Sequence, residues 1–304
     1  MPFPILALVG PTASGKSALA IALAREVDGE IINADAMQLY RGMDIGTAKT
    51  PLAERDGIAH HLLDVLSPAQ DASVADYQLQ AREVIAQVRQ RGKTAILVGG
   101  SGLYLRATLD DLDFPETDPV VRERLTVRGE EVGPGILYAE LLALDPVAAE
   151  RIGRHNTRRL VRALEVIELT GKPYSAHLPS YTYSLPAVQI ALTVDRPVLL
   201  DRIERRAAAM FAQGLLEETA AVREQGLGVT AARAVGYAQA LGVLDGVTDV
   251  PTAVEATSIA TRQVARRQVS WFGRDPRITW IDGEADPSHQ LDAALRRIET
   301  EPDA

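Results

Sequence analysis

The sequence of 304 residues contains no cysteine, which excludes structural disulfides and thiolate metal sites. It also has no long apolar run near its start. The opening segment, MPFPILALVG, holds about six consecutive apolar residues without a basic segment before them, too few for a signal peptide or a membrane span. Neither an internal repeat nor a low-complexity segment is present. These absences favour a globular, cytoplasmic protein with no membrane partner.

Basic residues are fewer than acidic ones, and the formal net charge is −9. Taken alone, that balance argues against a nucleic-acid partner. Two segments depart from it: residues 151–162 carry five arginines and residues 261–274 carry four, and neither contains an acid. Such segments can form a polyanion-binding face on an acidic protein, or they can be solvated helix faces. Charge alone favours solvated faces.

Apolar segments and helical patterns alternate along the first part of the chain. Short buried strands are expected at 5–9, 30–33, 94–98 and 187–194, and helices at 17–27 and 74–90. This alternation predicts an α/β fold, with a doubly wound parallel sheet that has helices on both faces.

The pattern becomes mainly helical after residue 113, with start signals such as Asp118-Pro119 and Asp145-Pro146. We therefore expect a core in two parts, 1–113 and 181–304, interrupted by a helical insertion at 114–180. Within the second core part we expect helices at 197–212, 215–225 and 252–272. An edge strand at 278–281 follows, and then a frayed tail after about residue 284.

The segment GPTASGKS at 10–17 matches the phosphate-binding loop pattern of P-loop nucleotide-binding proteins and lies between an expected strand and an expected helix. Its glycines let backbone N–H groups turn towards an anion, Lys16 adds a positive charge, and the Ser17 hydroxyl can ligate Mg²⁺. The residues expected around the bound phosphates are Gly10, Thr12, Ala13, Ser14, Gly15, Lys16 and Ser17.

The usual metal-holding aspartate of a kinase or nucleotide hydrolase is missing, because the apolar strand TAILV at 94–98 is followed by glycines. The loop therefore suits a diphosphate that is not part of a nucleotide. Asp35 follows the expected second strand, at the sheet edge that faces the ligand crevice. It can serve as a base or hold a cation there, or it can simply cap a turn.

Several motifs, in order and spacing, resemble those of the bacterial tRNA dimethylallyltransferases. They are GPTASGKS at 10–17, NADAMQLYRGMDIGTAK at 33–49, HHLLDVLSP at 60–68, GGSGLYLRA at 99–107, NTRRLVRALEV at 156–166, TGKPYS at 170–175, AVGYAQ at 234–239 and TRQVARRQVSWF at 261–272. The resemblance covers most of residues 5–272. It implies transfer of a dimethylallyl group from dimethylallyl diphosphate to the exocyclic amine of adenine at position 37 of tRNA, with release of diphosphate.

The resemblance also implies roles for single residues. Asp35 matches the general base, Lys16 assists the departing diphosphate, and Ser101 matches a hydroxyl beside the reaction centre. Arg206 matches an arginine that closes over the diphosphate, and Arg202 is a second choice one turn earlier. Family positions that contact the anticodon stem-loop correspond to Asp35, Ala36, Met37, Gln38, Ser101, Arg122, Arg158, Arg159, Leu160, Val161, Arg162, Arg233, Gly236 and Tyr237.

Three alternatives stay open at this point. The first is a P-loop kinase acting on a small molecule. The second is a prenyltransferase acting on free adenine nucleotides, which would not need the arginine segments. The third is an RNA-binding module whose phosphate loop has lost its use. Since no heptad pattern or exposed apolar run favours a dimer, we expect a monomer.

Overall fold

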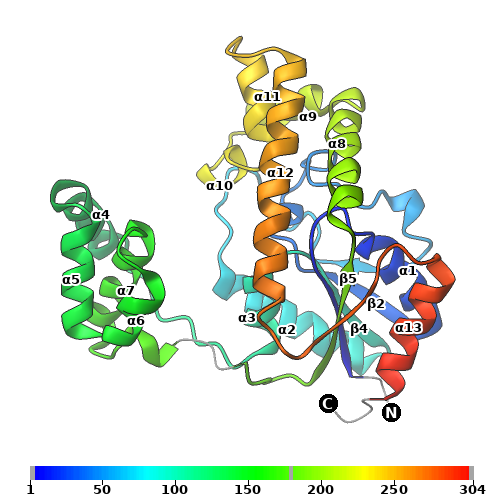
Figure 1. Cartoon of the computed structure of the whole chain (residues 1–304), viewed down its shortest axis with the longest axis horizontal. Coiled ribbons are helices and arrows are strands. Elements are labelled where there is room, and N and C mark those ends of the chain that lie inside the picture. Colours follow the sequence, from blue (N-terminus) through cyan, green and yellow to red (C-terminus); the bar gives the residue numbers. More distant parts are fainter. Residues whose placement is uncertain (1–3, 178–180, 301–304) are drawn as a thin grey trace. The chain divides into compact units, whose positions relative to one another are not determined.

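Figure 1 shows a computed structural model of the chain, which describes residues 4–177 and 181–300. The chain divides into two compact units, one made of Met1–Leu109 with Tyr183–Ala304 and the other of Asp110–Thr182. The insertion expected at 114–180 lies within the second unit, and its last three residues fall outside the described part of the chain.

The first unit contains a six-stranded sheet in which every pair of neighbours is parallel. The strand order is β3-β2-β4-β1-β5-β6, which confirms the predicted α/β class. The strands are β1 (Ile5–Val9), β2 (Gly29–Asn33), β3 (His60–His61), β4 (Thr94–Val98), β5 (Ala187–Thr193) and β6 (Ile278–Asp282).

Helices cover both faces of the sheet because successive side chains of a strand point to opposite sides. In β1, Ile5, Ala7 and Val9 join the core beneath α2 (Val74–Gln90) and α3 (Gly102–Leu109). Leu6 and Leu8 join the opposite core, beneath α1 (Lys16–Glu26) and α13 (Pro287–Glu299). The loops after β1, β2 and β4 consequently meet at one edge, where ligands bind in such sheets.

The C-terminal segment corrects one expectation. Residues 287–299 form the helix α13 instead of a frayed tail. Ala294 and Ile298 are buried on the core that α1 also covers, with Leu291 and Leu295 partly buried beside them. Apolar residues at this helical spacing give α13 a face to bury, and that burial outweighs the cost of ordering the segment.

Five further helices of the first unit follow β5. They are α8 (Arg196–Ala212), α9 (Leu215–Glu224), α10 (Val229–Ala232), α11 (Tyr237–Leu244) and α12 (Val250–Phe272). The long helices α8 and α12 run side by side (Figure 1). Short 3-10 turns lie at Ala36–Leu39 and Leu52–Glu54, after β2. The sequence patterns missed α3, α10 and α11, because short helices next to glycines carry little periodic signal.

The second unit is a bundle of four helices, α4 (Pro119–Val132), α5 (Pro134–Leu144), α6 (Pro146–Ile152) and α7 (Thr157–Thr170), followed by a 3-10 turn at Tyr174–His177. Side chains of Asp118, Asp145 and Asn156 accept backbone N–H groups at the starts of α4, α6 and α7. The first two caps coincide with the start signals Asp118-Pro119 and Asp145-Pro146. Nowhere in the described residues is there a helix with the length and apolarity that a bilayer crossing needs.

Candidate functional site

The phosphate loop connects β1 to α1 and surrounds a cavity of about 240 Å³. Gly15 has a φ of 100°, a left-handed conformation that residues other than glycine rarely adopt, immediately before the helix. Its neighbour Lys16 donates a hydrogen bond from Nζ to the Pro11 carbonyl oxygen, at 2.5 Å. Backbone N–H groups at the start of α1, together with this ammonium group, make the cavity suited to a phosphate-containing anion.

Asp35 lines the same cavity and is also the cap of a 3-10 turn. One carboxylate oxygen accepts the N–H of Met37 at 3.0 Å. The capping interpretation of Asp35 is therefore true, but it uses one oxygen and leaves the second for chemistry. Burial raises the pKa of Asp35, against the opposing effects of the Met37 N–H, Lys16 and Arg206. A carboxylate of raised pKa is a better proton acceptor near neutral pH.

Three charged side chains set the electrostatics of this cavity. Burial lowers the pKa of Lys16 to about 8, although Asp35 acts in the opposite direction. Burial also lowers the pKa of Arg206, again opposed by Asp35. The two cations and the single carboxylate therefore leave an excess of positive charge, which an anionic ligand would neutralise.

A second cavity, of about 300 Å³, is also lined by Asp35. Its walls are the turn after β2, the loop after β4 and one face of α12, and its lining includes Asp35, Ala36, Met37, Ser101, Thr257 and Arg267. The Ser101 hydroxyl oxygen accepts the N–H of Ala36 at 3.1 Å, which joins the loops after β2 and β4. Asp35 thus borders both the phosphate-loop cavity and this one.

The Gln38 side chain is held in one orientation by the loop 44–49. Its Nε2 donates to the carbonyl oxygen of Thr47 at 3.0 Å and to that of Ala48 at 3.4 Å. The side-chain oxygen of Gln38 is left as a hydrogen-bond acceptor.

The loop 44–49 is itself anchored by a residue that the sequence patterns missed. Glu218 of α9 accepts the backbone N–H groups of Asp44, Ile45 and Gly46 at 2.9 to 3.2 Å. A Cβ on Gly46 would lie 2.4 Å from the Tyr237 ring, so glycine is required for this approach. The motif RGMDIGTAK marked this loop as part of the family resemblance, but nothing in the motif indicated that its partner is on α9.

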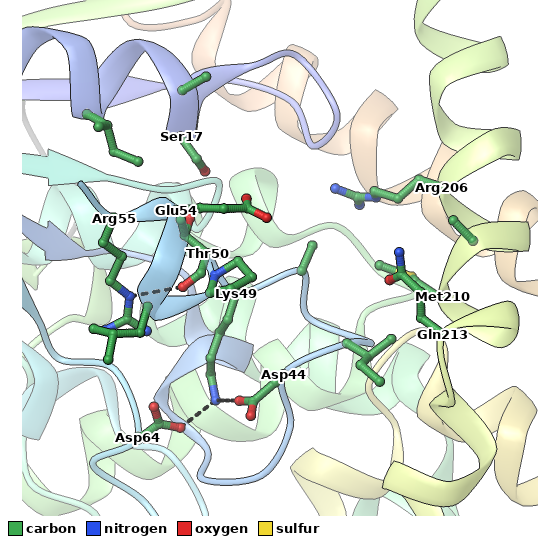
Figure 2. Close-up of a pocket in the computed structure, with 17 residues that line it drawn as sticks. Ser17, Asp44, Lys49, Thr50, Glu54, Arg55, Asp64, Arg206, Met210 and Gln213 are labelled. Atoms are coloured by element: carbon green, nitrogen blue, oxygen red, sulfur yellow. Dashed lines mark hydrogen bonds and ion pairs between the residues drawn. The ribbon is translucent and has the colours of Figure 1, made fainter. Parts of the chain in front are cut away.

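A third cavity, of about 860 Å³, lies beside α1 and is shown in Figure 2. The ammonium group of Lys49 donates to Asp44 and Asp64, and also to the Tyr40 carbonyl oxygen. Arg206, Met210 and Gln213 line the opposite wall (Figure 2). The contacts of Lys49, which is buried, make it an anchor for the loop 44–49.

The two arginines of α8 that were expected at the diphosphate lie in different places. Arg206 donates from Nη2 to the Thr12 hydroxyl at 2.5 Å and lines all three cavities described above. Arg202 lines a separate hollow beside the phosphate loop, with Gln290 of α13. This hollow also touches Ala13, Ser14 and Gly15 of the loop, but Arg202 does not line the cavity that Arg206 lines.

The arginines of the second unit divide into two groups. Arg158 and Arg159 are exposed on α7. Arg122 and Arg162 both form ion pairs with Glu165, at 2.7 and 3.0 Å. Leu160 and Val161 belong to the core of this unit, where their side chains support the arginines beside them.

Glu165 is fully buried and also accepts the N–H of Asp118 at 3.1 Å. Glu165→Gln should destabilise this unit by about 3 kcal/mol, because two arginines lose a buried partner. Hydrogen exchange of the α7 amides would measure the loss. Glu168→Gln is the matched control, since Glu168 pairs with Arg124 at an exposed position worth at most about 1 kcal/mol. Equal effects of the two substitutions would contradict a structural role for Glu165.

The segment 233–237 lies beside the second cavity. Arg233 is exposed, and the neighbouring Ala234 and Val235 line the cavity. Gly236 caps the start of α11 with a φ of 93°. Tyr237 is fully buried and donates its hydroxyl to Glu218 at 2.5 Å, so its side chain supports the segment from within.

The arrangement joins an anion-binding loop to a base-bearing cavity through Asp35. An electrophile whose leaving group is a phosphate-containing anion would sit with its reactive atom near this carboxylate. A nucleophile in the second cavity could then lose a proton to Asp35 as it attacks. The geometry suits group transfer with an anionic leaving group.

Comparison with known proteins identifies close relatives. A model of the family described as IPP transferase matches residues 38–275. The chain is 57% identical to the tRNA dimethylallyltransferase of Pseudarthrobacter chlorophenolicus, across 92% of this chain and 93% of that protein. It is 54% identical to the tRNA dimethylallyltransferase of Paenarthrobacter aurescens, across 98% and 96% of the two chains.

Solved structures of proteins with similar names resemble this chain over nearly its whole length. The full-length tRNA isopentenylpyrophosphate transferase of Bacillus halodurans is 36% identical, with a TM-score of 0.71 over 98% of this chain and 97% of that one. A eukaryotic dimethylallyltransferase acting on tRNA is 26% identical, with a TM-score of 0.83 over 98% and 79% of the two chains. The match to the family model and the similarity to these relatives over nearly the whole chain show that this protein belongs to the IPP transferase family.

Proposed function

We propose that this protein is a tRNA dimethylallyltransferase, which moves a dimethylallyl group from dimethylallyl diphosphate to the exocyclic amine of adenine at position 37 of tRNA. The observation that carries the proposal is the position of Asp35, which borders both the phosphate-loop cavity and the cavity beside α12. The family and the names of the relatives support it.

The donor occupies the phosphate loop in this proposal. Its allylic carbon gains positive charge as the carbon–oxygen bond breaks, so the main requirement is to stabilise the departing diphosphate. Lys16, the N–H groups at the start of α1, and Arg206 supply that stabilisation. The hydrogen bond of Arg206 to Thr12 in the loop supports this role.

The acceptor adenine occupies the second cavity, after it has been flipped out of the stacked anticodon loop at a cost of a few kcal/mol. Its exocyclic amine is a poor nucleophile because the lone pair is delocalised into the ring. The amine forms the carbon–nitrogen bond and passes a proton to the carboxylate oxygen of Asp35 that does not cap the turn. Ser101 holds the turn that carries Asp35 in place through Ala36.

Magnesium fits the oxygen chemistry of the phosphate-loop cavity. The Ser17 hydroxyl lines the cavity, while the described residues contain no cluster of three or more His, Cys, Asp or Glu that could hold a metal unaided. Such a site suits an ion that takes most of its ligands from substrate phosphates and water. When bound, Mg²⁺ would help to neutralise the diphosphate.

The RNA backbone requires positive charge on the protein surface. Arg158 and Arg159 on α7, Arg233 before α11 and Arg267 on α12 supply it, and all four are exposed. Arg122 and Arg162 can also contact RNA phosphates, but each already forms an ion pair with Glu165, which leaves less of their charge for a phosphate. A monomer and a cytoplasmic location stay predictions from the sequence.

The test is transfer of labelled dimethylallyl diphosphate, with Mg²⁺, into three acceptors. They are unmodified tRNA with adenine at position 37, the same tRNA with guanine there, and free AMP. We expect label in the first acceptor alone. Label in AMP would move the function to enzymes that prenylate free nucleotides. Phosphate transfer from ATP, with no prenyl transfer, would favour a small-molecule kinase and overturn the proposal.

A further inference from the structure

Gln268 lies on the face of α12 that borders both substrate cavities. It is half-buried, whereas its neighbours Arg267 and Val269 are exposed. Gln268 is a neutral residue within the arginine-rich segment 261–274. Its side chain contacts both the phosphate loop and the loop after β4.

Both ends of the Gln268 amide bind backbone groups of different loops. Its Oε1 accepts the N–H of Thr12, in the phosphate loop after β1, at 2.8 Å. Its Nε2 donates to the carbonyl oxygen of Gly100, in the loop after β4, at 3.0 Å. A Cβ on Gly100 would lie 2.1 Å from Nε2, so a side chain at this position would displace the Gln268 amide.

In the proposed function, the phosphate loop binds the donor and the loop after β4 lies beside the acceptor. Thr12 binds Gln268 of α12 through its N–H and Arg206 of α8 through its hydroxyl. Side chains of two helices therefore fix the phosphate loop, which binds the diphosphate in the proposed function. Gly100 precedes Ser101, which binds the turn that carries Asp35 on the acceptor side. The strands β1 and β4 are neighbours in the sheet, and Gln268 spans the ends of both.

We infer that Gln268 is a positioning residue that sets the separation between the diphosphate of the donor and the acceptor amine. The inference rests on the proposed function and names a role for a residue outside the phosphate loop. It acts through the backbone of Thr12 and Gly100, and not by donating or accepting the transferred proton.

The chemistry gives this role a specific signature. If the two sites separate, the allylic carbon–oxygen bond can still break, but the amine no longer lies in line to capture the carbon. Water then adds to the carbon, giving the prenyl alcohol and a proton, while diphosphate leaves as usual. Loss of alignment by about 1 Å can cost on the order of 100-fold in rate.

The experiment compares Gln268→Met with the wild type and with Gln263→Met. Methionine has a similar length and forms neither hydrogen bond. Gln263 is exposed on the same helix, which makes it the matched control. For Gln268→Met we expect kcat for prenyl transfer to fall by about 10- to 100-fold, with the KM values for tRNA and donor changing less than about threefold.

The decisive measurement is the ratio of diphosphate released to prenyl groups incorporated into tRNA. This ratio should be close to one in the wild type and in Gln263→Met, and should rise clearly in Gln268→Met. The ratio is counted per turnover, so it does not depend on how much of a variant folds. Gln268→Glu keeps an acceptor for Thr12 but faces Gly100 with a second oxygen, and we expect its ratio to rise as well.

Three results are distinguishable. A wild-type ratio in both Gln268 variants would overturn the positioning role. A raised KM for tRNA with unchanged kcat and ratio would also overturn it, because Gln268 would then be an RNA contact. Absence of prenyl transfer by the wild type would instead contradict the proposed function itself.

Discussion

Asp35→Asn should lose most of its turnover, with kcat falling on the order of 10²- to 10⁴-fold, as removal of a general base does. Asparagine keeps a side-chain oxygen for the N–H of Met37, so the cap of the turn can survive. The amide cannot take the proton of the amine. Affinity for dimethylallyl diphosphate should be unchanged or higher, because a negative charge beside the anion has been removed.

The pH profile gives an independent check on Asp35. Since its pKa is raised, kcat/KM should fall on acidification at a pH above the ordinary range of aspartate, as the carboxylate becomes protonated. The residual activity of Asp35→Asn should lack that acidic limb. Asp76→Asn, at an exposed position in the first turn of α2, serves as the control. Turnover of Asp35→Asn within about threefold of the wild type would remove Asp35 as the base.

Lys16→Met should lower kcat/KM for dimethylallyl diphosphate on the order of 10²- to 10³-fold, the size of effect seen when one preorganised donor to a developing anion is removed. Methionine has a similar length but no charge. Both binding of the donor and departure of diphosphate should suffer, so KM rises and kcat falls. Steady-state kinetics with saturating tRNA would measure both. Lys93→Met, on the surface near Asp28, should behave as the wild type.

Lys16→Arg separates charge from side-chain identity. In the free wild-type enzyme the ammonium loses its proton above a pKa of about 8, so kcat/KM for the donor should fall about tenfold per pH unit beyond that point. Arginine stays charged there, and the basic limb should move to higher pH. A basic limb that stays in place in Lys16→Arg would show that another group titrates.

Local patterns predicted most of the elements, for reasons visible in particular segments. The run Ile5–Val9 is entirely buried, so its continuous apolar character indicated a central parallel strand. The start signals Asp118-Pro119 and Asp145-Pro146 placed two helix starts to within a residue or two. Where a segment carried little signal of its own, as in α3 and α11, the prediction failed. The helix α13 was missed because its apolar face is narrow and its other positions are polar or charged.

The sequence by itself determined the phosphate loop, the alternation of strands and helices that indicates a parallel sheet, and the place of Asp35 at the end of β2. Those features depend on residues that are close in the chain, where spacing and burial period carry the information. Only the tertiary structure decided which distant residues complete the site. Gln268 binds Thr12 across 256 positions, Glu218 anchors the loop 44–46, and Arg206 reaches that site while Arg202 does not. Such contacts depend on how helices pack on the sheet, to within about one turn of helix, and no local pattern encodes that placement.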